Sequence, residues 1–577
     1  MTETSNPPAS PRFLSSRRMA AFFEDVFDEE TFFLLLSVFI GIFAGLGVVC
    51  FRLAIDWTRL ALLGPLPQSH SWRLFLVPSV AGLLVGLLVI RLFPGIRGSG
   101  VNQTKAALYI FNGYIPFRTA IGKFICCALA IGSGHSLGPE DPSLQIGASV
   151  ASALGRQVQL SREKLRLMAP VGATAGLAAA FNAPISAVLF VIEEVIGRWS
   201  AGILGSVVLS AVSSVVIVRW FLGSEPLFRI PATTFVRPAE LLAYAVLGIA
   251  GGVAAVIFAK AIGYLRPRLK ALPPWTQYLQ PAIAGLLIGF IAFLGFPQVM
   301  GAGYEFIDQA LHGQYAWQLL AGLAALKILA TTLSFVSGTP GGMFAPTLFI
   351  GGMLGGAVGG VEHIFFPHLT GSAATYVLVG MGVLFAGFLR APMTSVFMVL
   401  EVSGNYEIIV PVIVANTIAY VVSRSLQNVP IFDLLTRQDG LVLPSLEEER
   451  EATILRIEDA MLPVPSVILS AEDYVADAAR RVQDTPQDIF LIRMHPMGWN
   501  IIARDALRLL SSEGKGEFTL ASVISRQTLP YLYPDLPLET ALRYVNQVRL
   551  VPVVNRADSR NLEGVISSDA VLKKYRG

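Results

Sequence analysis

Two short stretches of the sequence place glycine, a functional side chain and proline in the same order. GPEDPSLQIG (138–147) and GMFAPTLFIG (342–351) share the pattern G-x-[EF]-x-P-[ST]-L-x-I-G. Proline suits the first turn of a helix, whose free N–H groups and positive dipole end favour an anion. Two such helix starts, one from each half of the chain, predict a site for one small anion without a fixed cation.

Glu140 places a carboxylate at this predicted anion site. When charged, it can occupy the site and block the path, and when protonated or displaced it yields, which makes it a candidate proton-sensitive gate. The plainer alternative is a carboxylate that stabilises the helix dipole by about 0.3–1 kcal/mol. A third glycine turn lies upstream, where the Ser99 hydroxyl is a candidate donor to an anion.

A second repeat in the chain separates two neighbouring acids. Residues 181–194 align with residues 389–402, so that Glu193 matches Glu401 while Glu194 has no counterpart. This predicts a shared structural role for Glu193 and Glu401. An acid at membrane depth is costly to bury and is therefore a candidate functional residue. Because Glu194 has no counterpart in the repeat, it is the better candidate for a proton relay. Its alternative is a helix end at the aqueous interface.

The elements that hold these residues are predicted to be membrane helices. Apolar residues make up 54% of the 577 residues and charged residues only 14%, and the charges return after about residue 430. Five segments are long enough, or nearly so, to span a bilayer: Thr31–Ile55, Trp72–Phe93, Leu204–Leu222, Leu241–Ile262 and Tyr406–Val422. Regions 120–194 and 319–402 are interrupted by Gly and Pro, which predicts short segments buried in protein around a polar cavity.

Composition also excludes several functions. A net charge of +3 is too small to indicate nucleic-acid binding, and the three cysteines lack the spacing of a disulfide framework or a metal site. We therefore predict no enzyme activity, no metal and no required cofactor. Arg12, Arg17 and Arg18 precede the first apolar run, which predicts a cytoplasmic N-terminal segment over residues 1–30.

The polar tail contains a repeat of its own. Residues 475–482 resemble residues 538–545, and residues 500–507 resemble residues 564–571. Each unit is predicted to run helix, strand, strand, helix. The tail resembles a tandem pair of CBS domains, at about 457–512 and 518–577, after a linker over 437–456.

The motifs together resemble the CLC family of chloride channels and chloride/proton antiporters. Residues 98–101 resemble its first anion-binding motif, residues 138–142 its G-x-E-x-P motif and residues 342–346 its G-x-F-x-P motif. The resemblance implies an all-α polytopic membrane domain of broken helices in an inverted repeat (31–436, with halves 31–222 and 240–436), followed by the α/β cytosolic CBS pair. It also implies a homodimer with one anion pathway per subunit.

The resemblance assigns roles by position. Glu140 resembles the external gating glutamate, and Glu194 resembles the internal proton glutamate of the antiporters. Ser99 and the N–H groups near Phe344 and Ala345 resemble the central anion site. The remaining candidate anion-binding residues are Gly100, Val101, Gly138 and Phe432.

The sequence also departs from the family pattern. Pro139 and Asp141 flank Glu140 where the family usually has Arg and Gly, and Asn102 replaces a proline. Phe432 stands where the family has a tyrosine whose hydroxyl donates to the central anion. An acid at Asp141 is expected to alter the protonation of Glu140 or to mimic it. Lys123, which matches Lys327 in the repeat, is a further candidate modulator, with structural support as its alternative.

We predict transmembrane chloride transport in the cell (inner) membrane, with the N-terminus and the CBS pair cytoplasmic. Proton-coupled exchange is preferred because of Glu194. A passive chloride channel is the alternative, and a CBS-linked divalent cation transporter is a remoter one. An adenine nucleotide in the CBS pair is disfavoured, because Asp569 and Asp505 do not keep the expected spacing from Ser or Thr. A structural dimerising module is preferred there.

Overall fold

A computed structural model describes most of the chain: residues 28–64, 70–158, 160–197, 201–228, 230, 238–368, 370–441, 443, 455–494, 498–525, 528–545, 548–556 and 558–576. The three N-terminal arginines and most of the predicted linker lie outside these residues. The chain forms two compact units, 1–446 and 447–577. Each unit is described by itself.

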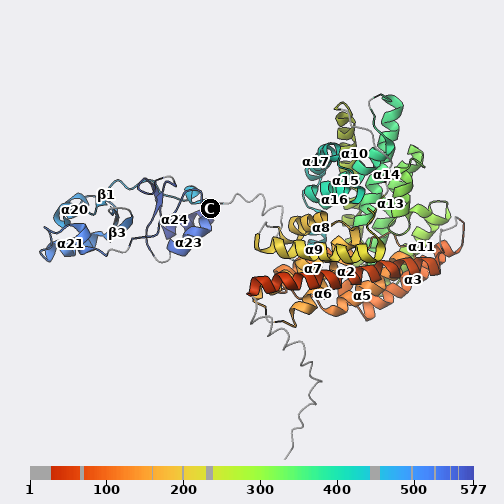
Figure 1. Cartoon of the computed structure of the whole chain (residues 1–577), viewed down its shortest axis with the longest axis horizontal. Coiled ribbons are helices and arrows are strands. Elements are labelled where there is room, and N and C mark those ends of the chain that lie inside the picture. The colour runs from red at the N-terminus through yellow and green to blue at the C-terminus, as the bar shows by residue number, and fades with distance from the viewer. Residues whose placement is uncertain are drawn as a thin grey trace, which may run out of the picture. The chain divides into compact units, whose positions relative to one another are not determined.

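All secondary-structure elements named within the described residues of the first unit are helices (Figure 1). Its first half contains α2 (Glu29–Leu62), α3 (Arg73–Arg91), η1 (Pro94–Ile96), α4 (Gly100–Tyr109), α5 (Phe117–Gly132), α6 (Glu140–Gly155), α7 (Arg162–Phe181), α8 (Pro184–Phe190), the π-helical η2 (Val191–Ile196) and α9 (Ala201–Leu222). Its second half contains α10 (Glu240–Lys270), η3 (Pro274–Tyr278), α11 (Gln280–Phe293), η4 (Pro297–Val299), α12 (Tyr304–Leu311), α13 (Trp317–Val336), α14 (Phe344–Phe365), α15 (Ala373–Leu389), α16 (Pro392–Ser403), α17 (Ile409–Leu426) and α18 (Ile431–Gln438).

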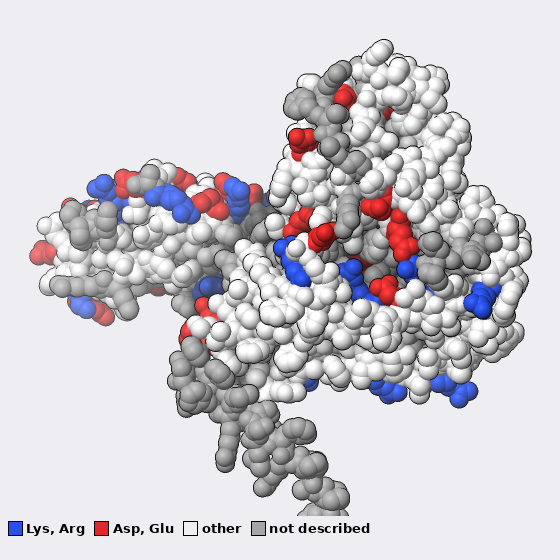
Figure 2. All heavy atoms as spheres, turned by 45° about the vertical axis from the view of Figure 1, so that its right-hand side comes forward, with Lys and Arg blue, Asp and Glu red and all other residues white. Residues whose placement is uncertain are grey.

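The two halves repeat the same packing. In the first half α2 packs against α7 and α9, and in the second half α10 packs against α15 and α17 (Figure 1). The contacts α6–α7 and α14–α15 are equivalent in the same way. The unit is an inverted repeat of broken membrane helices. Most of its visible surface carries no charge (Figure 2), as expected of a lipid-facing wall.

Within the described residues, seven helices are long and apolar enough to cross a membrane. They include α13 and α14, which lie in the region where only short interrupted segments were expected. For these two helices the prediction was wrong. Glycines inside α14 do not break it, because they lie at its contacts with α15 and α13, where the missing side chain allows close packing.

Repeated glycines bring these helices together. A Cβ atom added at Gly172 in α7 would lie 2.2 Å from the carbonyl oxygen of Gly147 in α6. In the second half, a Cβ atom at Gly380 would lie 2.3 Å from the carbonyl oxygen of Gly351. Gly147 and Gly351, the last residues of the two repeated motifs, therefore share a steric role, since glycine in the facing helix leaves room for their backbone.

Gly172→Ala is accordingly expected to destabilise the membrane unit by about 1–3 kcal/mol, the usual cost of overpacking a tight contact. Thermal unfolding in detergent measures the effect. Gly322→Ala in α13 is the matched control, because nothing lies within 4 Å of the Cβ atom added there. Equal melting temperatures for the two variants would contradict the steric explanation.

The second unit holds the predicted repeat of helix, strand, strand and helix. The first copy contains α20 (Val475–Arg481), β2 (Ile489–Arg493), β3 (Trp499–Ala503) and α21 (Arg504–Ser512), and the second contains α23 (Leu538–Val545), β4 (Val551–Val554), β5 (Leu562–Ile566) and α24 (Ser568–Arg576). Outside the copies lie η5 (Ile457–Asp459), β1 (Ile468–Ser470) and α22 (Leu520–Val523). The first sheet has the order β1-β2-β3, with β1 parallel to β2 and β3 antiparallel to it, and β4 pairs antiparallel with β5. Each copy encloses its own apolar core.

Candidate anion pathway

The two glycine-proline motifs meet in the middle of the membrane unit. The N–H of Gly138 donates to the carbonyl of Gly342, and the N–H of Gly342 donates back to the carbonyl of Gly138, both at 2.8 Å. This antiparallel bridge brings the starts of α6 and α14 to one point. The predicted convergence of two helix starts is therefore present. The N–H of Gly138, which was predicted to bind the anion, donates instead to the carbonyl of Gly342.

Glu140 lies over the start of α14. Its side chain is fully buried, and its Oε2 accepts a hydrogen bond of 3.2 Å from the N–H of Ala345. Its Oε1 accepts one from the hydroxyl of Tyr304. A Cβ atom at Gly138 would lie 2.3 Å from Glu140 Oε2, so glycine leaves the space into which the carboxylate folds. Glu140 thus takes the donor that an anion would use at this helix start.

Asp141 points to a different helix start, that of α4. Its Oδ1 accepts hydrogen bonds from the Ser99 hydroxyl at 2.8 Å and from the Val101 N–H at 3.1 Å. Its Oδ2 accepts one from the Gly100 N–H at 2.7 Å. All three groups predicted to bind an anion at this turn therefore bind the Asp141 carboxylate. The sequence indicated that Asp141 alters the protonation of Glu140 or mimics it, but not which donors it binds.

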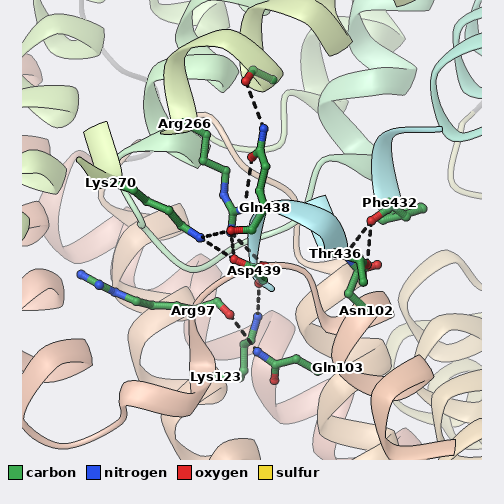
Figure 3. A network of polar contacts seen from close by, with 12 residues as sticks. Arg97, Asn102, Gln103, Lys123, Arg266, Lys270, Phe432, Thr436, Gln438 and Asp439 are labelled. Carbon is green, nitrogen blue, oxygen red and sulfur yellow. Dashed lines mark hydrogen bonds and ion pairs between the residues drawn. The ribbon is translucent and has the colours of Figure 1, made fainter. Parts of the chain in front are cut away.

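Asp141 borders a small gap, whose other lining residues are Ser99, Phe335, Gly341, Met343, Phe344 and Phe432. The gap leaves no room for a water molecule. The rings of Phe344 and Phe432 lie 6.4 Å apart, and Phe190 contacts both. The Asn102 amide donates to the Phe432 carbonyl at 2.9 Å, which ties α4 to the start of α18 (Figure 3).

Two pockets approach this point from different sides. One, of about 140 Å³, is lined by Tyr304, the partner of Glu140, and by Asp56, Arg59 and Glu305. The other, of about 250 Å³, reaches Gly98 beside Ser99 and is lined by Arg97, Arg266 and Lys270. One pocket therefore reaches the tyrosine that contacts Glu140, and the other, which is rich in cations, reaches the residue before Ser99.

The cationic pocket contains a polar network (Figure 3). Arg266 and Lys270 point to Asp439, with N–O distances of 2.9 and 2.5 Å. Lys123 Nζ donates to the carbonyl of Gly98 at 3.1 Å. Its repeat partner Lys327 donates to the carbonyl of Gly301 at 2.7 Å. Both lysines therefore hold glycine turns, which is the structural role left open by the sequence.

Sequence reasoning missed Tyr304, although a signal was present. FPGIRGSG (93–100) and FPQVMGAG (296–303) share the pattern F-P-x-x-x-G-x-G, and Val101 and Tyr304 are the residues that follow. Gly98 and its counterpart Gly301 both adopt positive φ, of 82° and 57°. The α4 start thus faces Asp141, and the equivalent α12 start supplies the tyrosine that faces Glu140.

Glu194 lies in η2 and forms a buried ion pair. Lys105 Nζ lies 2.5 Å from Glu194 Oε1 and 3.8 Å from Asp433 Oδ1, and these side chains are 2%, 10% and 14% exposed. Glu194 therefore lies inside the protein and not at an exposed helix end. Lys105, which sequence reasoning also missed, is four residues after Val101 on α4.

Glu193 and Glu401 have the shared structural role that the repeat predicted. Glu193 accepts hydrogen bonds from the N–H and hydroxyl of Thr394, at 3.0 and 2.7 Å, at the start of α16. Glu401 accepts from the N–H groups of Ile185 and Ser186, at 2.9 and 2.7 Å, at the start of α8. Each acid caps the short helix of the other half, which explains why the two match.

The family described as voltage gated chloride channel matches residues 81–424, which include all of these motifs. This chain belongs to the CLC family. A ClcB-like chloride channel protein of Ralstonia nicotianae is 32% identical over 68% of this CLC chain and 94% of its own length. An H(+)/Cl(-) exchange transporter, ClcA, of Salmonella arizonae is 31% identical over 70% of this chain and 87% of its own.

A solved structure gives the same picture of the CLC fold. The crystal structure of a slow cyanobacterial Cl-/H+ antiporter has a TM-score of 0.65 and 26% identity, and the match covers 72% of this chain and 99% of that one. The family is one of transporters and channels, and this chain is a membrane protein of that kind. Of its departures from the family pattern, Asp141 and Phe432 line the small gap, and Asn102 donates to the Phe432 carbonyl.

Proposed function

We propose that this CLC protein exchanges chloride for protons across the cell (inner) membrane. The observation that carries the proposal is the buried Glu140 carboxylate, which accepts the Ala345 N–H at the start of α14. A carboxylate in that place can leave and return, so that an anion and a proton share one gate. The names of the Salmonella and cyanobacterial relatives support exchange.

Each candidate residue has a role in this scheme. Glu140 is the gate, and its release exposes the Ala345 N–H to the anion. Glu194 is the relay that brings protons from the side of α4, where Lys105 holds it. The cations of the second pocket attract chloride toward Ser99. Preformed N–H groups at helix starts bind the anion without a full charge, so that it also leaves.

The passive channel is the second candidate. Phe432 provides a ring but no hydroxyl at the gap, which favours weaker binding of a central anion and looser coupling. The Ralstonia relative is named as a chloride channel protein. Exchange is preferred because Glu194, a carboxylate that channels of this family often lack, is buried next to the pathway.

We further propose that the protein is a homodimer with cytoplasmic termini, and that its second unit is a tandem CBS pair. The two copies of helix, strand, strand and helix support the CBS assignment. A structural role in dimerisation is preferred over nucleotide sensing, because Asp505 and Asp569 lie one residue from the expected position in each copy.

Chloride efflux from proteoliposomes, with internal pH recorded at the same time, tests the exchange. We expect chloride efflux to drive protons inward against their gradient, and Glu194→Ala to stop the proton movement while chloride still leaves. Chloride efflux without proton movement in the wild-type protein would favour the channel. No chloride flux at all would overturn both.

A further inference from the structure

Asp141 is the charged group of the pathway that this exchange scheme does not use. We propose that its carboxylate is a second tethered anion, which occupies the Ser99 side of the pathway as Glu140 occupies the α14 side. An anion that crosses the protein then has to displace two carboxylates in turn. This inference rests on the proposed function, because it concerns the same pathway.

The contacts of Asp141 are those of a bound anion. It accepts three hydrogen bonds, from the Ser99 hydroxyl and from the Gly100 and Val101 N–H groups, at 2.7 to 3.1 Å. Hydrogen bonds from N–H groups at a helix start are the means by which proteins hold small anions. Asp141 is 2% exposed and Ser99 is 4% exposed, so water does not compete for these donors.

The backbone around Asp141 is built for this close approach. A Cβ atom at Gly342 would lie 2.9 Å from the Cβ of Asp141, and one at Gly100 would lie 2.6 Å from the Asp141 carbonyl oxygen. Glycine at both positions lets the starts of α4, α6 and α14 meet. A side chain at residue 141 can therefore reach the turn that holds Ser99.

The two successive carboxylates divide the pathway between them. Glu140 takes the Ala345 N–H and the Tyr304 hydroxyl, whereas Asp141 takes the donors of the Ser99 turn. The gap that joins Asp141, Phe344 and Phe432 leaves no room for water, and hence none for a larger chloride ion. Chloride enters this place only when the Asp141 carboxylate leaves it.

A fixed brace that caps α4 is the competing explanation for the same contacts. The two explanations predict different effects of an Asp141 substitution on chloride affinity. A displaceable carboxylate competes with chloride for Ser99, so its removal raises the affinity, whereas a brace does not compete. Asp141→Asn keeps the shape and one acceptor oxygen but removes the charge. Asp141→Gly removes the side chain and creates space next to Ser99.

The experiment is calorimetric titration of chloride into purified wild-type protein, Asp141→Asn, Asp141→Gly, Ser99→Ala and the Asp141→Gly/Ser99→Ala double variant. We expect Asp141→Gly to bind chloride about tenfold more tightly than the wild type, which corresponds to about 1.4 kcal/mol. We expect the double variant to lose that gain, and Ser99→Ala alone to change little. Such non-additivity shows that the two residues act on one site.

Unchanged chloride affinity in both Asp141 variants, together with a lower melting temperature, would establish the brace and overturn the proposal. If the variants do not fold, bromide soaked into crystals of the wild-type protein decides the question by its anomalous signal. Bromide beside Ser99 with Asp141 turned away supports displacement, and Asp141 unmoved at high bromide contradicts it. Wild-type chloride flux, measured in the liposome assay, separates a failure of this inference from a failure of chloride transport itself.

Discussion

Glu140→Gln is expected to abolish proton movement while chloride continues to leave the liposomes. Glutamine keeps the size of the side chain, but it neither carries a negative charge nor takes up a proton. It therefore accepts the Ala345 N–H less strongly than a carboxylate, because hydrogen bonds to charged groups are roughly twice as strong as neutral ones. The anion displaces it readily, and no proton is exchanged for the anion.

The measurement is simultaneous recording of chloride efflux and internal pH, with wild-type protein and Glu140→Gln side by side. We expect the uphill proton flux to fall at least tenfold in the variant, to the background of empty liposomes. Glu305→Gln is the matched control, since Glu305 follows Tyr304, the partner of Glu140, but its own carboxylate pairs at 2.6 Å with Arg59 at the surface. Proton flux that persists in Glu140→Gln would remove Glu140 from the gate.

Lys105→Met is expected to lower the free energy of unfolding of the membrane unit by about 3–5 kcal/mol. The Lys105 side chain lies between Glu194 and Asp433, and all three are largely buried. Removal of the lysine takes away a buried cation that lies close to both carboxylates. Breaking a buried ion pair from one side usually costs this much, because the remaining charge stays desolvated.

A double-mutant cycle tests this account of the ion pair. Denaturant titration in detergent micelles gives the free energy of unfolding for the wild type, Lys105→Met, Glu194→Gln and the double variant. We expect the double variant to recover part of the loss caused by Lys105→Met, because Glu194 is then neutral and only Asp433 still carries a charge beside the methionine. Lys260→Met, at an exposed lysine of α10, is the control and is expected to change little. Additive losses in the double variant would contradict the pairing.

Local sequence patterns predicted most of the fold and part of the pathway. Long apolar runs indicated the spanning helices, because backbone groups in lipid have to be satisfied within a helix. The repeated glycine-proline motifs indicated helix starts that converge on an anion, since proline and glycine act through their own backbone geometry. The match of Glu193 with Glu401 indicated a shared structural role, which their reciprocal caps on α16 and α8 confirm.

Only the tertiary structure decided which donors each carboxylate takes. The successive residues Glu140 and Asp141 look alike in the sequence, but they face opposite helix starts, because the antiparallel bridge between Gly138 and Gly342 sets their directions. The ion pair of Lys105 with Glu194 joins residues 89 positions apart in the chain. Contacts of this kind depend on how two inverted halves pack, and no local pattern of residue types encodes that packing.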